Sequence, residues 1–357
     1  MRHALFNLLH EKYGNPPDCR MRRQMLRDTL AATAGLLLSD GLCFPARAER
    51  TASPGKRALV IGAGLAGLAA SHELASAGYD VSVVEARNRL GGRVVTFRDL
   101  VPGKTVEGGG EFIGSNHPTW LAYAKQFGLK LRDVSKDWLK ETPIILGGKR
   151  LTANEGRKLW LEMQLALPKL NTEAAKFNAN EPWKSSTARE LDLQTAADWL
   201  AGLAVSDLAR LGLLVHFVGD AGVHPAWQSY LSLLAHVKGG GLEKYWTDSE
   251  VYRCEGGNQM LARKLAEKIG EKRISLGTPV TAVSEGPKLT VITLANGKKL
   301  EVDDVILAAP PSTWQRIAFQ PLRPAMGAPQ MATHIKFLAV VKSRFWKALK
   351  LSPESLT

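Results

Sequence analysis

The residues of this 357-residue chain best suited to chemistry are the glycines that follow its first β-rich run. Residues 62–67 read Gly-Ala-Gly-Leu-Ala-Gly, with a β-rich run before them (56–61) and a helix-type stretch after them (68–77). In this order Gly62 allows a tight turn, Gly64 lets the backbone approach a pyrophosphate, and Gly67 allows a helix to pack closely on a strand. The N–H groups at the helix N-terminus then face the phosphates. The pattern predicts a dinucleotide cradle, and a glycine turn that serves packing alone is the alternative.

An acidic residue follows at the spacing expected for a ribose contact. A second strand-like run, 80–84, ends at Glu85, which lies 18 residues beyond Gly67. The acid that accepts hydrogen bonds from a ribose diol is expected about 20 residues after the glycines. A carboxylate there also disfavours the 2′-phosphate of NADP.

Two further glycine segments favour FAD over NAD. Residues 85–93 read Glu-Ala-Arg-Asn-Arg-Leu-Gly-Gly-Arg, in which Gly91 and Gly92 again permit close approach and Arg93 offers a fixed positive fork to phosphate. A basic surface loop is the alternative. The third segment, 107–114, reads Glu-Gly-Gly-Gly-Glu-Phe-Ile-Gly and supplies bare backbone against which a flat ring can lie.

The runs VIGAGLAGLAASHELASAGYDVSVVEARNRLGGRVVT and EGGGEFIGSNHP resemble the FAD-dependent amine oxidases, which include monoamine, L-amino-acid and polyamine oxidases. The first two motifs are shared with flavin desaturases and porphyrinogen oxidases, whereas the third, with residues 115–118, favours the bacterial amine oxidases. By this resemblance Gly62, Gly64, Gly67 and Arg93 face the pyrophosphate and Glu85 holds the ribose. Gly109 to Phe112 run beside the flavin.

The resemblance assigns FAD contacts to a longer set of residues. The expected cofactor-binding residues are Gly62, Ala63, Gly64, Leu65, Ala66, Gly67, Glu85, Ala86, Arg87, Gly92, Arg93, Gly109, Gly110, Glu111, Phe112 and Val280. Val280 matches the residue whose backbone meets the adenine. The alternative is that Val280 is simply a buried strand residue.

One lysine interrupts an apolar strand pattern near the C-terminal end of the sequence. Residues 333–341 predict a strand that places Lys336 on the same face as Leu338 and Val340. From chemistry alone, Lys336 is either a partly buried functional charge or an edge residue whose ammonium reaches solvent. In the amine oxidases the matching strand carries a lysine that holds a water against flavin N5. The resemblance therefore implies a catalytic role for Lys336.

The cofactor implies the reaction. An amine or L-amino acid gives hydride to flavin N5, water hydrolyses the resulting imine, and O2 reoxidises the flavin to release H2O2. The expected partners are thus a small amine or amino acid and O2. A flavin desaturase or porphyrinogen oxidase is one alternative. An inactive truncated FAD-binding fragment is another, because family members continue past residue 357.

The expected fold class is α/β, with a Rossmann-like FAD-binding domain interleaved with a helical, mixed substrate domain. Helical spacing of apolar residues marks the middle of the chain, and Asn296-Gly297 predicts a hairpin. The predicted segments are an export signal (1–48), FAD-binding segment 1 (49–118), a helical substrate-domain segment (119–250), FAD-binding segment 2 (251–315) and the start of an incomplete substrate-domain sheet (316–357). Three sets of residues carry the helical spacing: Leu159, Met163, Leu167 and Leu170; Leu208, Leu211, Leu214 and Val215; Tyr230, Leu233, Leu234 and Val237.

Residues 21–48 have the layout of an export signal. Arg22 and Arg23 precede a short apolar stretch, 29–38, and Ala46-Arg47-Ala48 supplies a small-residue cleavage site. The arginine pair resembles a twin-arginine signal, so a periplasmic or secreted location is expected, and a cytoplasmic one if this interpretation fails. The stretch is too short for a transmembrane span. Residues before Met21 show no apolar periodicity, which makes Met21 a candidate start.

Composition excludes several classes of protein. Hydrophobic residues make up 45% and charged residues 23%, as in an ordinary globular chain. Three widely spaced cysteines and eight histidines without ligand spacing predict neither a metal site nor a disulfide framework. The net charge of +13 is compatible with anionic partners but names none, and no nucleic-acid motif accompanies it. The oligomeric state and the identity of the amine are not encoded in any motif.

Overall fold

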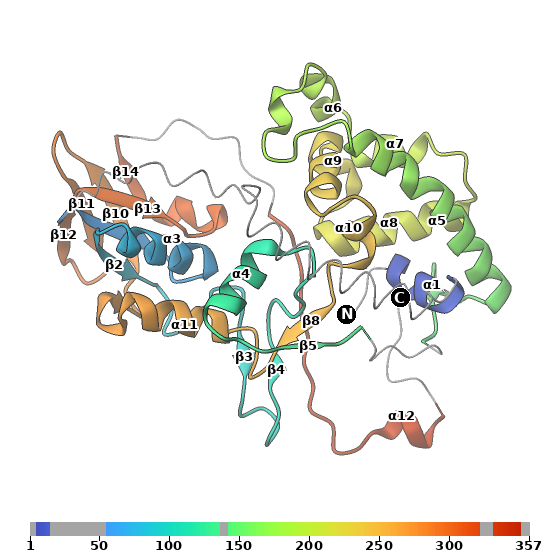
Figure 1. Cartoon of the computed structure of the whole chain (residues 1–357), viewed down its shortest axis with the longest axis horizontal. Helices are drawn as coiled ribbons and strands as arrows, with labels where there is room; N and C mark the ends of the chain where they lie inside the picture. The colour runs from blue at the N-terminus through green and yellow to red at the C-terminus, as the bar shows by residue number, and fades with distance from the viewer. Residues whose placement is uncertain (1–4, 15–54, 136–141, 322–330, 351–357) are drawn as a thin grey trace.

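The computed structural model describes residues 5–14, 55–135, 142–321 and 331–350. Two bodies lie side by side in it (Figure 1). One is built on a β-sheet that carries α3 and α11, and the other is a group of helices, α5 to α10, with α1 beside them. The twin-arginine-like segment, including Arg22, Arg23 and residues 46–48, lies outside the described residues.

A four-stranded parallel sheet forms the centre of the first body. Its strands, in the order β13-β1-β2-β9, are β13 (Asp304–Leu307), β1 (Arg57–Ile61), β2 (Asp80–Val84) and β9 (Ile274–Ser275). β1 is therefore flanked by a strand that follows it closely in sequence and by one almost 250 residues away, since Ala58 pairs with both Val81 and Asp304. This arrangement confirms the predicted α/β fold.

The alternation of side chains along β1 explains the two layers that cover this sheet. Ala58 and Val60 face α3 (Leu65–Ser76) and α11 (Met260–Ile269), which bury their apolar faces on the sheet. Leu59 and Ile61 face the opposite way, toward a second sheet. All four residues are at most 5% exposed, so β1 is buried on both sides, as is usual for a parallel strand under two layers.

The second sheet has the strand order β12-β11-β10-β14. Its strands are β10 (Val280–Glu285), β11 (Thr290–Leu294), β12 (Lys299–Val302) and β14 (Ala318–Gln320). The predicted hairpin joins β11 to β12, and Gly297 adopts the positive φ of +82° that such a turn requires.

The helical body is built on α5 (Ala153–Ala174), α8 (Asp207–Ala221) and α9 (Tyr230–Gly239). The predicted apolar faces of α5 and α9 are confirmed, because all eight residues in them are buried. The helix predicted from the second set of apolar residues is formed as α8. Leu208, Leu211, Leu214 and Val215 flank the core, and Ala209, Leu213, His216 and Phe217 are buried.

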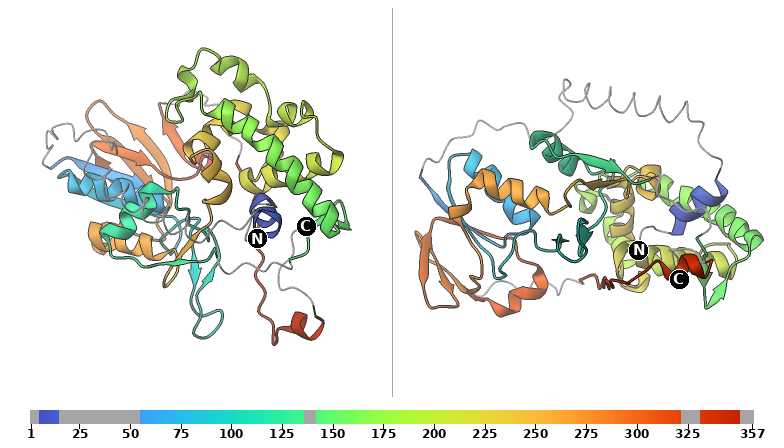
Figure 2. Two further views of the ribbon diagram at one scale, coloured as in Figure 1. Left: turned by 45° about the vertical axis from the view of Figure 1, so that its right-hand side comes forward. Right: turned by 90° about the horizontal axis from the view of Figure 1, so that it is seen from below.

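A short N-terminal helix, α1 (Leu5–Tyr13), completes this core. Leu5 and Leu9 are 1% and 0% exposed, and α1 packs against α5, α8 and α10 (Figure 2). The expectation that residues before Met21 lack an apolar pattern was therefore wrong for α1, whose Leu5, Leu8 and Leu9 share one helical face.

Shorter elements complete the two bodies and the region between them. They are β3 (Thr96–Phe97), β4 (Val106–Glu107), α4 (Pro118–Gln126), β5 (Leu131–Asp133), β6 (Ile145–Leu146), β7 (Lys149–Arg150), η1 (Pro182–Lys184), α6 (Ala188–Leu193), α7 (Ala196–Ala201), η2 (Pro225–Trp227), α10 (Glu243–Thr247), β8 (Tyr252–Cys254), η3 (Glu271–Arg273), η4 (Pro311–Arg316) and α12 (Phe345–Ala348). Among the helices of the described residues, none has the length and apolar character needed to cross a bilayer.

The strand predicted over residues 333–341 is not formed. Residues 331–341 carry no strand assignment, and Ile335 and Phe337 are 94% and 87% exposed. A strand needs a neighbour for its backbone groups, and this segment instead bonds to the end of α8: Thr333 N–H donates to the Gly222 carbonyl oxygen at 2.9 Å.

Candidate active site

The first glycine segment forms the turn between β1 and α3. Gly62 has φ +113°, and a Cβ there would lie 3.2 Å from the backbone of Ala308. At Gly67, on the first turn of α3, a Cβ would lie 1.9 Å from the Gly62 carbonyl oxygen. Both positions therefore need glycine for the reasons that the motif predicted.

The Glu85 side chain lies against this glycine turn. Its two carboxylate oxygens accept hydrogen bonds from the backbone N–H groups of Ala63, at 2.8 Å, and Arg87, at 2.9 Å. The carboxylate is thus fixed at the end of β2, next to the glycine turn. That is the position predicted for a ribose-binding acid.

The N-terminus of α3 shows how an anion could bind beside the glycine turn. Its N-cap residue is Gly64, which has no side chain with which to cap the helix. The N–H groups of a first helical turn need acceptors from outside the helix, and a pyrophosphate supplies them. The bare N-terminus and the fixed carboxylate of Glu85 together fit a dinucleotide such as FAD.

The second glycine segment lies against the first. Gly91 N–H donates to the Ala63 carbonyl oxygen at 2.9 Å, and a Cβ on Gly92 would lie 3.1 Å from the Cα of Gly64. The guanidinium of Arg89 donates to the Gly92 carbonyl oxygen at 2.8 Å and holds the loop closed. Arg93 is exposed, and within the described part of the chain its guanidinium makes no hydrogen bond or ion pair, so it remains available to a phosphate.

The third glycine segment lies against the second. Gly110 N–H donates to the Arg93 carbonyl oxygen at 3.1 Å, and Gly108 N–H donates to that of Val95 at 2.8 Å. A Cβ on Gly109 would lie 2.0 Å from the Arg93 carbonyl oxygen. The three segments, which span about 50 residues of sequence, therefore meet along one continuous line of backbone.

Five more of the predicted residues have simple positions. Leu65 and Ala66 belong to the first turn of α3, and Ala86 and Arg87 are exposed at the end of β2. Val280 begins β10 and is 9% exposed in the core between the two sheets, where it packs with Ile61 and Val84.

A buried asparagine that the sequence analysis missed holds the third segment in place. The Asn258 amide donates to the carbonyl oxygens of Glu111 at 2.7 Å and Gly110 at 3.2 Å. Its side-chain oxygen accepts from Cys254 N–H at 2.9 Å, and the residue is 3% exposed. The signal was present in the glycine pair, 256–257, that precedes it.

Glu107, Thr96 and Gln259 extend this support. Glu107 is 8% exposed, and its carboxylate accepts from Asn258 N–H at 2.8 Å and from the Thr96 hydroxyl at 2.9 Å. The Gln259 amide reaches the second segment and donates to the Leu90 carbonyl oxygen at 2.9 Å. These buried polar groups are paired with one another, which fixes the glycine backbone rigidly.

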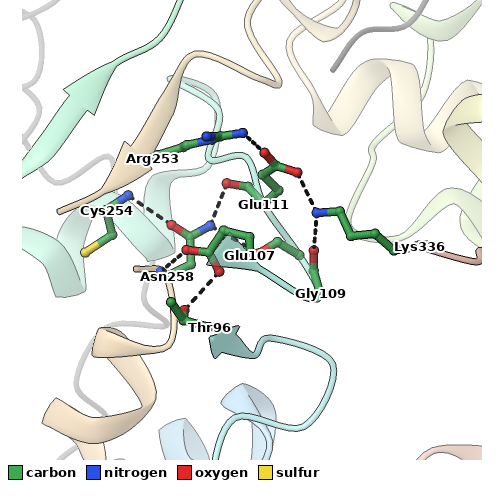
Figure 3. A network of polar contacts seen from close by, with 9 residues as sticks. Thr96, Glu107, Gly109, Glu111, Arg253, Cys254, Asn258 and Lys336 are labelled. Carbon is green, nitrogen blue, oxygen red and sulfur yellow. Dashed lines mark hydrogen bonds and ion pairs between the residues drawn. The ribbon is translucent and has the colours of Figure 1, made fainter. Parts of the chain in front are cut away.

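Lys336 reaches this site from a distant part of the sequence. Its ammonium donates to the Gly109 carbonyl oxygen at 3.3 Å and to the Glu111 carboxylate at 2.5 Å (Figure 3). The same carboxylate forms an ion pair with Arg253, whose guanidinium also lies 5.0 Å from the ring centroid of Phe112. Burial lowers the pKa of Lys336, the positive charge of Arg253 lowers it further, and Glu107 raises it.

The segment that carries Lys336 is anchored on α8. Besides the Thr333 bond, His334 Nε2 lies within hydrogen-bond distance, 3.1 Å, of the Gly219 carbonyl oxygen. A Cβ on Gly222 would lie 2.4 Å from the His334 ring. The C-terminal end of α8 therefore directs Lys336 toward the third glycine segment.

The residues that meet at this site suit a nucleotide cofactor. Among the described residues, no group of three or more His, Cys, Asp or Glu could hold a metal ion. The residues that meet here are glycine backbone, fixed carboxylates and two cations. Such a site can hold a dinucleotide and bring one ammonium to its reactive end.

Known proteins resemble this chain in sequence. Putrescine oxidase of Kocuria rosea is 30% identical over 320 residues, which cover 82% of this chain and 66% of that protein. The L-amino acid dehydrogenase of Synechocystis sp. is 27% identical over 310 residues, covering 81% and 64%. This chain thus spans slightly less than two thirds of the length of these relatives.

Solved structures agree with the fold. Cyclohexylamine oxidase from Brevibacterium oxydans matches with a TM-score of 0.65 and 26% identity, over 76% of this chain and 61% of that one. A wild-type putrescine oxidase bound to putrescine matches with a TM-score of 0.64 and 25% identity, over 76% and 62%.

The family model for flavin containing amine oxidoreductases matches residues 65–356, most of the chain and nearly all of the site. The resemblance seen in the glycine segments is confirmed, as is the FAD cofactor that it implied for the family. The chain belongs to the flavin-containing amine oxidoreductase family.

Proposed function

We propose that this chain binds FAD and oxidises a small amine or L-amino acid with O2 as the final electron acceptor. One observation carries the proposal: the Lys336 ammonium lies 3.3 Å from the carbonyl oxygen of Gly109, on the backbone where three glycine segments meet. A dinucleotide cradle alone is common to many flavoproteins. A lysine brought to its third segment from more than 220 residues away is a more specific feature.

The residues of the cradle bind and orient the cofactor. Gly64 and the uncapped N-terminus of α3 hold the pyrophosphate, with Arg93 as a second positive contact. Glu85 holds the ribose. Gly109 to Phe112 would border the flavin ring, and the Asn258 amide fixes their backbone through the carbonyl oxygens of Gly110 and Glu111. FAD, when bound, accepts the two electrons that leave the C–H bond next to the substrate nitrogen.

Lys336 positions water in this proposal. Its ammonium has three donors, of which two contact Gly109 and Glu111, and the third has no partner among the described residues and would hold a water at Nζ. A water fixed there lies close to the backbone that borders the ring. Holding reactants in one geometry accelerates a reaction without a covalent step by the protein.

Substitution of the lysine tests the proposal. We expect peroxide release by the FAD-loaded chain with at least one member of a panel of amines and L-amino acids. Lys336→Met should slow it by roughly 10- to 100-fold, since the water loses its donor. The matched control is Lys347→Met, which removes an exposed lysine of α12.

Three results of this experiment would contradict the proposal. Peroxide release that is equal in wild type and Lys336→Met excludes a catalytic Lys336. Activity on polyenes or porphyrinogens but on no amine assigns the chain to another class of flavin enzyme. A chain that binds no FAD is not an oxidase of this kind.

A further inference from the structure

The Lys336 ammonium has a closer partner than the carbonyl on which its proposed role depends. The Glu111 carboxylate oxygen lies 2.5 Å from Nζ, whereas the Gly109 carbonyl oxygen lies 3.3 Å away. Lys336 lies in a segment without a strand assignment, and among the described residues these two contacts are the hydrogen bonds of its ammonium. The orientation of the lysine therefore depends on Glu111.

Glu111 is itself held on both of its sides. Its carboxylate lies between the Lys336 ammonium and the Arg253 guanidinium, with which it forms a second ion pair (Figure 3). Its backbone carbonyl oxygen accepts the bond from the Asn258 amide at 2.7 Å. The side chains of Glu111, Arg253 and Lys336 are 17%, 23% and 26% exposed, so solvent screens these charges only partly. An ion pair with this geometry and limited exposure can set a side-chain position, unlike most surface pairs.

We propose that Glu111 is a positioning residue that holds the Lys336 ammonium on the Gly109 carbonyl and that Arg253 holds Glu111 in the orientation needed to do so. This inference rests on the proposed function, because it takes Lys336 as the residue that positions water. It adds that the Glu111 carboxylate, acting through Lys336, is needed to hold the ammonium at the Gly109 carbonyl.

The charges around Lys336 allow a test in which two substitutions are expected to shift the pKa of Lys336 in opposite directions. The groups that face its ammonium are Glu111, Arg253 on β8 and Glu107 on β4. A carboxylate in contact favours the charged form of a lysine, and a neighbouring cation disfavours it. Glu111→Gln should therefore lower the pKa of Lys336, and Arg253→Gln should raise it. If the substitutions only loosened the structure, Lys336 would become more exposed in both variants. Its pKa would then rise toward its ordinary value in both, because burial is the largest cause of the lowered pKa.

The pKa can be measured without turnover or cofactor. The full chain is reductively methylated with 13C-formaldehyde, the lysine resonances are followed by NMR as pH rises, and Lys336 is assigned by the signal that Lys336→Met lacks. We expect opposite shifts in Glu111→Gln and Arg253→Gln. Glu267→Gln, which removes the carboxylate of an exposed Lys264–Glu267 pair on α11, should leave the Lys336 resonance unchanged.

Flavin reduction provides the second readout. With the FAD-loaded chain and one amine, Glu111→Gln should reduce the rate constant by roughly tenfold or more, because the ammonium leaves its position. Glu111→Asp keeps the charge on a shorter arm and should recover part of the rate, which guards against a variant that merely folds poorly.

The outcomes separate this inference from the proposed function. An unchanged pKa of Lys336 in Glu111→Gln, or a rate equal to that of the wild type, overturns the positioning role while amine oxidation stands. If no amine reduces the wild-type flavin, the proposed function fails. The lysine titration then still decides whether Glu111 holds Lys336.

Discussion

Gly67 is the position in the glycine turn where an added side chain would be tolerated least. A Cβ there would meet the Gly62 carbonyl oxygen at 1.9 Å and the Ala308 side chain at 3.1 Å, so either α3 or the turn before it must move. We expect Gly67→Ala to lower the melting temperature and to weaken FAD binding at the same time. Both effects arise because one backbone approach serves packing and phosphate binding together.

The control for this substitution is another helical glycine. Gly219 lies on the exposed side of α8, and nothing stands within 4 Å of a Cβ added to it. Gly219→Ala should stabilise the chain by about 0.5–1 kcal/mol. Thermal unfolding with and without FAD measures both variants. A Gly67→Ala chain that binds FAD as tightly as the wild type would contradict the cradle described here.

His216 makes the stability of the helical body depend on pH. The ring is 1% exposed among Phe6, Phe217 and Trp246, and neither of its nitrogens has a hydrogen-bond partner among the described residues. Burial lowers the pKa of His216, while the nearby carboxylate of Asp220 raises it. Because the folded state has the lower pKa, the unfolded state binds the proton more readily below the ordinary value of about 6.5. Stability is therefore lost as pH falls through that window.

The variant His216→Phe should remove this part of the acid sensitivity, since it keeps an aromatic ring in the same cluster and cannot be protonated. The measurement is the difference in melting temperature between variant and wild type, which should grow in favour of the variant as pH falls from about 7 to about 5. If the melting temperatures of variant and wild type change in parallel over this pH range, His216 does not take up a proton on unfolding.

At the scale of elements, α1 contributes buried side chains to the helical core and helps to stabilise it. Leu9 is fully buried against α5 and its neighbours, and the added Cβ of Gly212 on α8 would lie 3.2 Å from Leu5. We expect Leu9→Ala to destabilise the chain by about 2–5 kcal/mol through a cavity in this core. Leu161→Ala, on the exposed face of α5, should change stability by less than about 0.5 kcal/mol. Denaturant unfolding measures both, and equal effects would show that α1 does not pack as described.

The elements also show what sequence patterns can and cannot predict. The glycine turn, Glu85 and the β11–β12 hairpin were predictable because the residues that explain them lie within about 20 positions of one another. Asn258 and Arg253 were missed because their partners, Gly110 and Glu111, are nearly 150 residues away. The fully buried residues of α8 were not predicted for a similar reason. The side of α8 that is buried depends on α1 and α5, which its own periodicity does not reveal.

Lys336 also shows the limit of prediction from local sequence patterns. Its importance came from the resemblance, and the apolar pattern around it predicted a strand that the described residues do not form. Strand formation depends on a pairing partner as well as on side-chain pattern. The contact with Gly109 is instead fixed by the anchoring of the segment on α8 and by the Glu111 carboxylate.

At the scale of the molecule, the site lies where segments far apart in the sequence converge. Glycine backbone comes from residues 62–67, 91–93 and 108–111, and support comes from residues 253–259 and Lys336. The Ser115 hydroxyl donates to Asp248 at 2.9 Å and the Asn116 amide donates to the Gly240 carbonyl oxygen at 2.8 Å, which ties the third segment to the helical body. The two bodies therefore position one site jointly.

Anaerobic reduction of the bound flavin tests the central claim most directly. The full chain is loaded with FAD, freed of oxygen and mixed with members of the amine and L-amino-acid panel while the flavin absorbance is recorded. We predict that at least one amine bleaches the flavin, that oxygen restores its colour, and that one H2O2 forms per flavin reoxidised. A chain that binds FAD in the glycine cradle but whose flavin stays oxidised with every amine would contradict the account.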